Sequence, residues 1–347
     1  MIQLKLTTPI VLLATFLSTF ADAGQKDSRF DIYWVDVEGG AATLMVTPLG
    51  ESILIDTGNP GRRDPDRIVQ VATKFANLRQ IDHLIVTHYH RDHYGGASTL
   101  ATMLPIISMY DNGVFEGMPD NPGKAYFDLK CDKRHVITAG DSLALKQDQE
   151  KDIRWELRCL ATRKQFIDPE KVDAKENEAI KKLHKPKDRD GSDNANSVVM
   201  LLKFGPFEFF DAGDLTWNQE FNLVYPKNLV GEVDVYQVTH HGLDSSNNPV
   251  VLSSVKPRVA IMNNGVTKGC LPEVFANLKA AKSLKAIYQV HKNLREDGET
   301  NNVGDEFIAN HERECKGHYI KLSVDPAGKT YTVSIPAHGH AKTYETK

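Results

Sequence analysis

The 347-residue sequence is poor in several features that mark common protein classes. It has only four cysteines, Cys131, Cys159, Cys270 and Cys315, and none stands in a Cys-x-x-Cys pair, so a zinc-thiolate ribbon is not indicated. The formal net charge is only −4 at pH 7, which argues against a large polybasic surface for duplex nucleic acid but leaves a local basic groove open. The chain also has no internal repeat and no linker long enough to force a second domain.

Long apolar runs are also missing, except near the N-terminus. Lys5 precedes an apolar run from Ile10 to Phe20, and Ala21-Asp22-Ala23 follows it as a small-x-small cleavage pattern. The run is too short to span a bilayer comfortably as a permanent helix. We expect residues 1–23 to be a signal peptide, and residues 24–347 to be secreted or periplasmic without a stable membrane anchor. An uncleaved anchor and a buried first helix are the alternatives.

Export would place all four cysteines in an oxidising compartment. Four cysteines there permit two disulfides in three connectivities. We favour the pairs that are neighbours in sequence, Cys131–Cys159 and Cys270–Cys315.

The densest chemistry follows the apolar run from Leu84 to Val86, which predicts a buried strand. His88, His90, Asp92 and His93 then stand within six residues. Imidazole and carboxylate are ligands for zinc, manganese or iron. The first two histidines can face one point from an extended segment, and the Asp-His pair, after a turn, can face a second. The pattern predicts a hydrolytic site for two divalent metal ions.

This motif also carries a resemblance. His88-x-His90-x-Asp92-His93 after a hydrophobic strand, with Asp56-Thr57-Gly58 upstream, resembles the metallo-β-lactamase superfamily. Ala212-Gly213-Asp214 and His240-His241-Gly242 resemble the hydrolase domain of bacterial competence (DNA-uptake) channel proteins and related extracellular phosphodiesterases. The resemblance spans about residues 30–265. It implies one α/β domain, a four-layer αβ/βα sandwich with a binuclear metal site at one edge of its sheets.

The residue pattern agrees with this class. Apolar runs predict strands at 52–55, 84–86, 106–109, 198–202, 207–210, 233–238 and 259–262, and a helical period covers Asp66 to Leu78. We also expect a helix from Val274 to Ile287 and a hairpin of 318–324 with 330–335. Residues 162–192 are charged and poor in large apolar side chains, which predicts a surface insertion. Alternatively, Lys185 and Lys187 of this insertion cover an acidic substrate.

The resemblance implies a role for each motif residue. Asp56 supports the metal loop, and Asp214 is the carboxylate that bridges the two ions, with Asp211 as the alternative. Asp92, His93, Asp214 and one histidine of the 240–241 pair hold the second ion. We take His241 as that ligand and His240 as a catalytic acid or phosphate donor. The roles of the two histidines can be exchanged on sequence alone.

One position departs from the superfamily pattern. Many members carry a Gly-His segment shortly before the bridging aspartate, and none occurs between His93 and Asp214. Asp193 falls at that place, and Asn194 and Ser197 match an Asn-x-x-Ser pattern of the competence-like branch.

The first ion is therefore expected on His88, His90 and Asp214, together with Asp193 or with water alone. A harder ligand set favours manganese or magnesium over zinc. We take zinc as the first choice for the two ions and manganese as the second.

The predicted function is a secreted, binuclear metal-dependent hydrolase. A hydroxide that bridges the ions would attack a phosphoester, and Asp92 would orient this nucleophile. The partner would be a small-molecule or phosphoester substrate, with nucleic acid outside the cell as a further candidate. A lactam or lactone hydrolase is the alternative enzyme, and a non-catalytic metal- or polymer-binding protein is the alternative of another class. The oligomeric state is not predicted.

Overall fold

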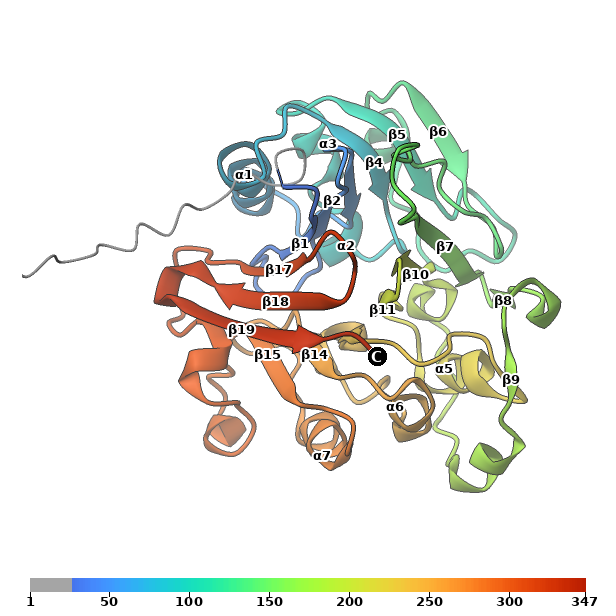
Figure 1. Ribbon diagram of the computed structural model, residues 1–347. Helices are drawn as coiled ribbons and strands as arrows, with labels where there is room; N and C mark the ends of the chain where they lie inside the picture. The colour runs from blue at the N-terminus through green and yellow to red at the C-terminus, as the bar shows by residue number, and fades with distance from the viewer. Residues whose placement is uncertain (1–26) are drawn as a thin grey trace, which may run out of the picture.

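The computed structural model describes residues 27–347 (Figure 1). The predicted signal peptide, residues 1–23, therefore lies outside the described residues. In the described part of the chain, no helix has both the length and the apolar composition needed to cross a bilayer.

Two large β-sheets form the framework. The nine-stranded sheet has the order β19-β18-β17-β1-β2-β3-β4-β5-β6. Its strands are β1 (Phe30–Trp34), β2 (Thr43–Val46), β3 (Ser52–Ile55), β4 (Ile81–Ile85), β5 (Ile106–Asp111), β6 (Lys133–Val136), β17 (Ile320–Val324), β18 (Thr330–Ile335) and β19 (His340–Glu345).

The eight-stranded sheet has the order β16-β15-β14-β13-β11-β10-β7-β8. Its strands are β7 (Trp155–Thr162), β8 (Gln165–Phe166), β10 (Val199–Phe204), β11 (Phe207–Asp211), β13 (Val235–Gln237), β14 (Val259–Met262), β15 (Ala286–His291) and β16 (Ile308–Asn310). A small pair joins β9 (Lys175–Glu176) to β12 (Lys227–Asn228).

Helices cover the outer faces of both sheets (Figure 1). The N-terminal half carries α1 (Arg63–Gln70), which continues as a π-helix over Val71–Phe75, and the short α2 (Arg91–Tyr94), α3 (Ala97–Leu100) and α4 (Lys124–Phe127). The C-terminal half carries α5 (Trp217–Val224), α6 (Pro249–Val255) and α7 (Pro272–Ala280).

Three apolar clusters separate four layers. Side chains of β1 alternate between faces: Ile32 and Trp34 point into the cluster between the sheets, and Tyr33 points to the cluster under α1 and α3. Trp34 meets Phe209 of β11 edge-on, with ring centroids 5.6 Å apart. The third cluster lies between the eight-stranded sheet and the helices α5, α6 and α7. This arrangement is the predicted αβ/βα sandwich.

The strands that precede the predicted site residues run parallel. β3, β4 and β5 are parallel neighbours in one sheet, and β11, β13, β14 and β15 are parallel neighbours in the other. Their carboxyl ends therefore fall at one edge of each sheet. Asp56 and His88 follow the first set, and Asp214 and His241 follow the second.

The secondary structure differs from the sequence-based expectation at two places. The helix expected from Val274 to Ile287 ends at Ala280, and residues 286–291 form β15 instead, because they pair in parallel with β14. The strand β19, which pairs with β18 along its length, was not predicted from the sequence. Pairing with other strands determines the secondary structure of both segments, and the local hydrophobic periodicity does not reveal such pairing.

The predicted disulfides are also wrong, because all four cysteines are free thiols. Cys159 lies in the cluster between the sheets, whereas Cys131 packs against the cluster under α1 and α3. Cys270 is buried 2.8 Å from the carbonyl oxygen of Asn301. Cys315 is partly exposed, and its sulfur contacts Asp36 and Arg67. The two members of each predicted pair therefore occupy separate environments.

Gln237 of β13 is a buried polar link between the sheets. Its Oε1 accepts hydrogen bonds from Trp34 Nε1 and Thr43 Oγ1, both at 2.8 Å. We predict that Gln237→Leu lowers the free energy of unfolding by about 1–3 kcal/mol, since both donors lose their acceptor. Urea unfolding measures the loss. Gln165→Leu on the exposed β8 is the control, and an equal loss in both variants would contradict the prediction.

Candidate metal centre

Four side chains each bring one ligand atom within 4.8 Å of the other three: Asp92, His93, Asp214 and His241. Asp214 Oδ2 lies 3.0 Å from His93 Nε2 and 3.3 Å from His241 Nε2. Asp92 Oδ2 lies 3.4 Å and 3.2 Å from the same two nitrogens. The structure thus brings together the residues predicted for the second ion, and their mixed imidazole and carboxylate donors fit a divalent cation.

His88 faces the same carboxylate from a greater distance, with Nε2 3.9 Å from Asp214 Oδ2. This nitrogen is buried and has no hydrogen-bond partner in the described part of the chain, while Nδ1 lies 3.1 Å from Thr87 Oγ1. A buried polar atom without a partner is costly. A bound cation would remove that cost, so His88 fits the first ion.

His90 packs edge-on against the His88 ring, with ring centroids 4.7 Å apart. Its Nε2 lies 3.3 Å from Asp120 Oδ2, and the side chain is partly exposed. His90 is therefore beside the site, turned toward a carboxylate that the sequence analysis did not single out.

Hydrogen bonds at Nδ1 orient two of the imidazoles. His93 Nδ1 lies 2.7 Å from Asp56 Oδ2, which also accepts a bond from Thr87 Oγ1 at 2.8 Å. His241 Nδ1 lies 3.3 Å from the carbonyl oxygen of Asn263. An acceptor at Nδ1 leaves Nε2 free to bind a metal. Asp56 thus lies where its predicted supporting role requires.

The buried groups of the cluster shift one another's pKa values. Burial acts to lower the pKa of His93, but the carboxylates around it, Asp214 foremost, outweigh burial and raise that pKa well above 6.5. Burial acts to raise the pKa of Asp214, but the neighbouring imidazoles hold it well below its ordinary value. The cluster therefore needs positive charge between its carboxylates, which protons or bound cations can supply.

The backbone at the second histidine pair is strained. His240 has φ 55° and His241 has φ 56°, in the left-handed region that non-glycine residues rarely adopt. Such a conformation costs of order 1–3 kcal/mol per residue. Gly269 packs against this turn, and a Cβ there would come within 1.9 Å of the His241 carbonyl oxygen. The strain persists because the surrounding loops hold the turn that aims both imidazoles.

His240 adjoins the cluster without being one of its four members. Its Nε2 lies 3.4 Å from Asp214 Oδ2, and its Nδ1 lies 3.0 Å from Ser245 Oγ and 3.1 Å from Ser246 Oγ. Burial lowers the pKa of His240 to about 4. At pH 7 this imidazole is neutral, so the predicted role as a donor fits its neutral N–H rather than an imidazolium.

The structure does not bring Asp193 into the cluster. Its Oδ2 accepts a bond from the backbone N–H of Tyr89 at 2.6 Å, and its Oδ1 accepts one from Asn196 Nδ2 at 2.9 Å. One carboxylate oxygen therefore holds the metal loop, and the other holds the 3₁₀ turn of Asp193 itself. The neighbouring Asn194 reaches the site: its amide nitrogen is 3.4 Å from His240 Nε2, and its Oδ1 is buried and has no hydrogen-bond partner among the described residues.

Lys268 belongs to the site but was missed by the sequence analysis. Its Nζ forms an ion pair with Asp92 Oδ2, and its side chain is 37% exposed. It is a single lysine in a turn after β14, far from Asp92 in the chain, so no local motif marks it. It places a cation at the exposed rim of the cluster.

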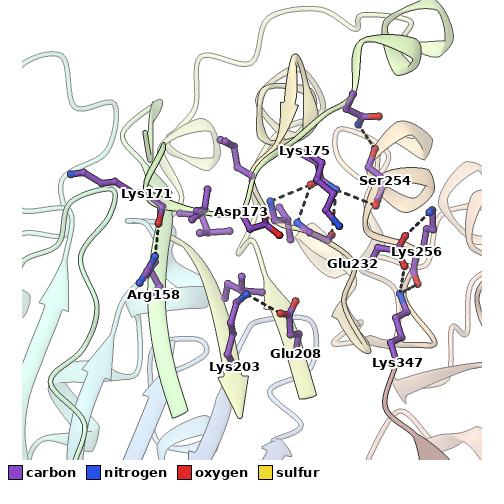
Figure 2. Close-up of a pocket in the computed structure, with 18 of the residues that line it drawn as sticks. Arg158, Lys171, Asp173, Lys175, Lys203, Glu208, Glu232, Ser254, Lys256 and Lys347 are labelled. Carbon is purple, nitrogen blue, oxygen red and sulfur yellow. Dashed lines mark hydrogen bonds and ion pairs between the residues drawn. The ribbon is translucent and has the colours of Figure 1, made fainter. Parts of the chain in front are cut away.

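A cavity of about 690 Å³ lies elsewhere, beside the charged insertion, and none of the predicted site residues lines it (Figure 2). Figure 2 shows Lys203 paired with Glu208, at 2.9 Å, and Glu232 between two lysines. Lys187, at the far end of the insertion, pairs with Glu273 at 2.8 Å. These charges neutralise one another, which favours a surface insertion over a cover for an acidic substrate.

Residues 35–155 match the sequence profile of the metallo-beta-lactamase superfamily. The chain contains a domain of this superfamily. Over 263 residues it is 27% identical to Recombination protein 2 of Haemophilus influenzae, covering 76% of this chain and 27% of that protein. Over 258 residues it is 23% identical to Competence protein ComA of Neisseria gonorrhoeae, covering 74% and 30%. Over 77 residues it is 37% identical to a UPF0173 metal-dependent hydrolase of Cupriavidus metallidurans, covering 21% and 23%.

The chain thus spans less than a third of the length of the curated relatives it matches. The predicted superfamily and the predicted fold are confirmed, and the match agrees with the predicted enzyme class, a metal-dependent hydrolase.

We predict that Asp56→Ala weakens zinc binding about 10–100-fold, because His93 Nδ1 loses the acceptor that fixes its tautomer. Competition with a chromophoric chelator measures the affinity. Asp211→Asn is the matched control: Asp211 Oδ1 accepts from the Gly213 N–H at 2.9 Å, and burial raises the pKa of Asp211 to about 7, so the amide is a close substitute. Equal weakening in both variants would show that Asp56 has no specific part in the site.

Proposed function

We propose that the chain is a phosphodiesterase that uses two divalent cations at the shared edge of its sheets. The observation that carries the proposal is the position of Lys268, whose ammonium lies on the Asp92 carboxylate at the exposed rim of the ligand cluster. A cation at that place suits a substrate whose reacting group is an anion.

In this proposal two sets of ligands share Asp214. His93, His241 and Asp92 would hold one ion. His88 would hold the other together with His90, whose Nε2 lies 3.3 Å from Asp120 Oδ2 and would turn from that carboxylate to the ion. Asn194 Oδ1, which is buried and has no hydrogen-bond partner within residues 27–347, would complete this second set in place of Asp193, whose two oxygens both accept hydrogen bonds. Imidazole donors favour zinc, and the oxygen donors leave manganese as the second choice. When bound, such a pair of cations supplies a water of lowered pKa and polarises an ester oxygen.

The chain's own groups would bind and orient the ester. Lys268 would pair with a non-bridging phosphate oxygen. Ser246 Oγ donates its hydrogen to the carbonyl oxygen of Leu215, whereas Ser245 Oγ, 3.0 Å from His240 Nδ1, can donate to that nitrogen and so favours the tautomer with the proton on Nε2. That N–H would donate a hydrogen bond to the leaving ester oxygen and so support its departure.

Two further parts of the proposal concern the substrate and its location. Relatives named for recombination and competence support a nucleic-acid phosphodiester as the substrate. We further propose that the chain acts outside the cytoplasm after cleavage at Ala23. The support for export is the sequence pattern of residues 1–23 alone.

The test is hydrolysis of bis(p-nitrophenyl) phosphate by the metal-loaded chain. We predict that Asp92→Ala lowers kcat/KM on the order of 100-fold or more, because it removes a ligand at the reacting centre. Lys268→Ala should raise KM about tenfold, the effect of one lost charge-assisted hydrogen bond. Lys203→Ala, whose ammonium pairs with Glu208 beside the separate cavity, is the control and should leave both constants unchanged.

Three outcomes would contradict the proposal in different ways. Turnover of nitrocefin or a lactone without phosphodiester cleavage would replace the substrate class. Normal phosphodiester kinetics in Lys268→Ala would remove the observation that carries the proposal. Failure to bind metal after supplementation with zinc or manganese would leave a non-catalytic binding protein.

A further inference from the structure

A second group of metal-ligating side chains lies away from the residues assigned above. Asp36 follows β1, His291 ends β15, and Cys315 lies in the segment between β16 and β17. Each offers one ligand atom, and the three atoms lie within 4.8 Å of one another. The three residues are far apart in sequence, so no sequence motif marks them.

His291 has a buried nitrogen that lacks a partner. The side chain is completely buried, and Nδ1 lies 3.2 Å from the carbonyl oxygen of Lys292. That carbonyl can only accept, so Nδ1 carries the hydrogen and Nε2 carries the lone pair. Nε2 has no hydrogen-bond partner in the part of the chain described. An imidazole oriented by a backbone carbonyl with its other nitrogen free is the usual state of a metal ligand.

Asp36 and Cys315 already contact each other. The thiol of Cys315 donates a hydrogen bond to Asp36 Oδ2 at 2.9 Å, and Asp36 is completely buried. Replacement of the thiol proton by a metal ion would put two negative charges, one carboxylate and one thiolate, around a divalent cation. The group therefore balances the charge of such an ion without further residues.

Arg67 is the cation already present beside this group. Its Nη1 lies 3.1 Å from Asp36 Oδ2, and its Nη2 lies 3.4 Å from Cys315 Sγ and 3.3 Å from Glu38 Oε1. If Asp36 binds a metal ion, the Arg67 guanidinium still has Glu38 as a counter-ion. Burial, foremost, and the Asp36 carboxylate raise the pKa of the Cys315 thiol to about 11, and Arg67 offsets part of that rise.

We propose that Asp36, His291 and Cys315 form a zinc site that is separate in its residues from the cluster around Asp214. Thiolate and imidazole are preferred zinc ligands, and a carboxylate oxygen completes a three-ligand set with one position left for water. On binding, the Cys315 thiol loses its proton to solvent and the sulfur forms the bond to the metal.

The placement assigns a structural role to this site. β1 belongs to the nine-stranded sheet and β15 to the eight-stranded sheet, and Cys315 lies on the connection from one sheet to the other. A bound ion would tie both sheets to the segment that returns the chain to β17. Because the three ligands meet only in the folded chain, zinc would raise its thermal stability.

Cobalt(II) is the probe for the test, because a thiolate bound to cobalt gives a charge-transfer absorption that histidine and carboxylate ligands do not. The four-residue cluster around Asp214 contains no cysteine. We predict the absorption in the reduced full-length mature chain and in Asp214→Ala, and its loss in Cys315→Ser. His291→Ala should weaken it. Cys131→Ser, which changes another partly exposed thiol, is the matched control and should retain it.

A second measurement uses the unmodified chain, so that it does not depend on the folding of a variant. Zinc should protect Cys315 from alkylation and leave the rate at Cys131 unchanged, as read by peptide mass spectrometry. Absence of the charge-transfer absorption at excess cobalt, its survival in Cys315→Ser, or equal alkylation of Cys315 with and without zinc would each overturn the proposal.

Discussion

The arrangement of the site depends on one buried carboxylate. Asp214 lies in the turn after β11, and its Oδ2 has four imidazole nitrogens within 3.9 Å, from His88, His93, His240 and His241. A buried negative charge is stable only when it is paired. The imidazoles around Asp214, and the cations they are suited to hold, meet that requirement. The left-handed turn at His240 and His241 is tolerated because it places two of these imidazoles beside Asp214.

The sheets make this meeting of side chains possible. Parallel strands place their carboxyl ends at a common edge, and the inward-facing cluster holds the two sheets in register with each other. Each ligand therefore arrives from a different strand end, and the site exists only in the folded chain. Metal binding and folding are coupled for that reason. The buried contact of Trp34 with Gln237 belongs to the same framework, since it joins β1 to the strand that precedes the second histidine pair.

The sequence predicted well what local motifs encode. His93 and Asp92 stand in a motif with fixed spacing, and Asp214 and His241 each follow a recognisable buried strand, so their convergence follows from parallel topology. The choice between Asp193 and Asn194 was not predictable, because one residue of rotation in a 3₁₀ turn exchanges which side chain faces the site. Lys268 reaches Asp92 only through the tertiary fold.

The errors elsewhere have the same cause. The end of α7 and the existence of β19 depend on pairing with distant strands, which no window of sequence contains. The cysteines were paired by their order in the chain, but Cys131 and Cys159 pack in different layers. Non-local contacts thus decided each of these features, while hydrophobic alternation was sufficient for the strands of the sandwich interior.

The central claim is that Asp214 lies between two metal ions. Anomalous diffraction at the zinc edge, from a crystal of the zinc-loaded chain, tests it most directly. The account predicts two peaks about 3.5–4 Å apart that share the Asp214 carboxylate, one beside His93 and His241 and the other beside His88. A single peak, or peaks that do not touch Asp214, would contradict it.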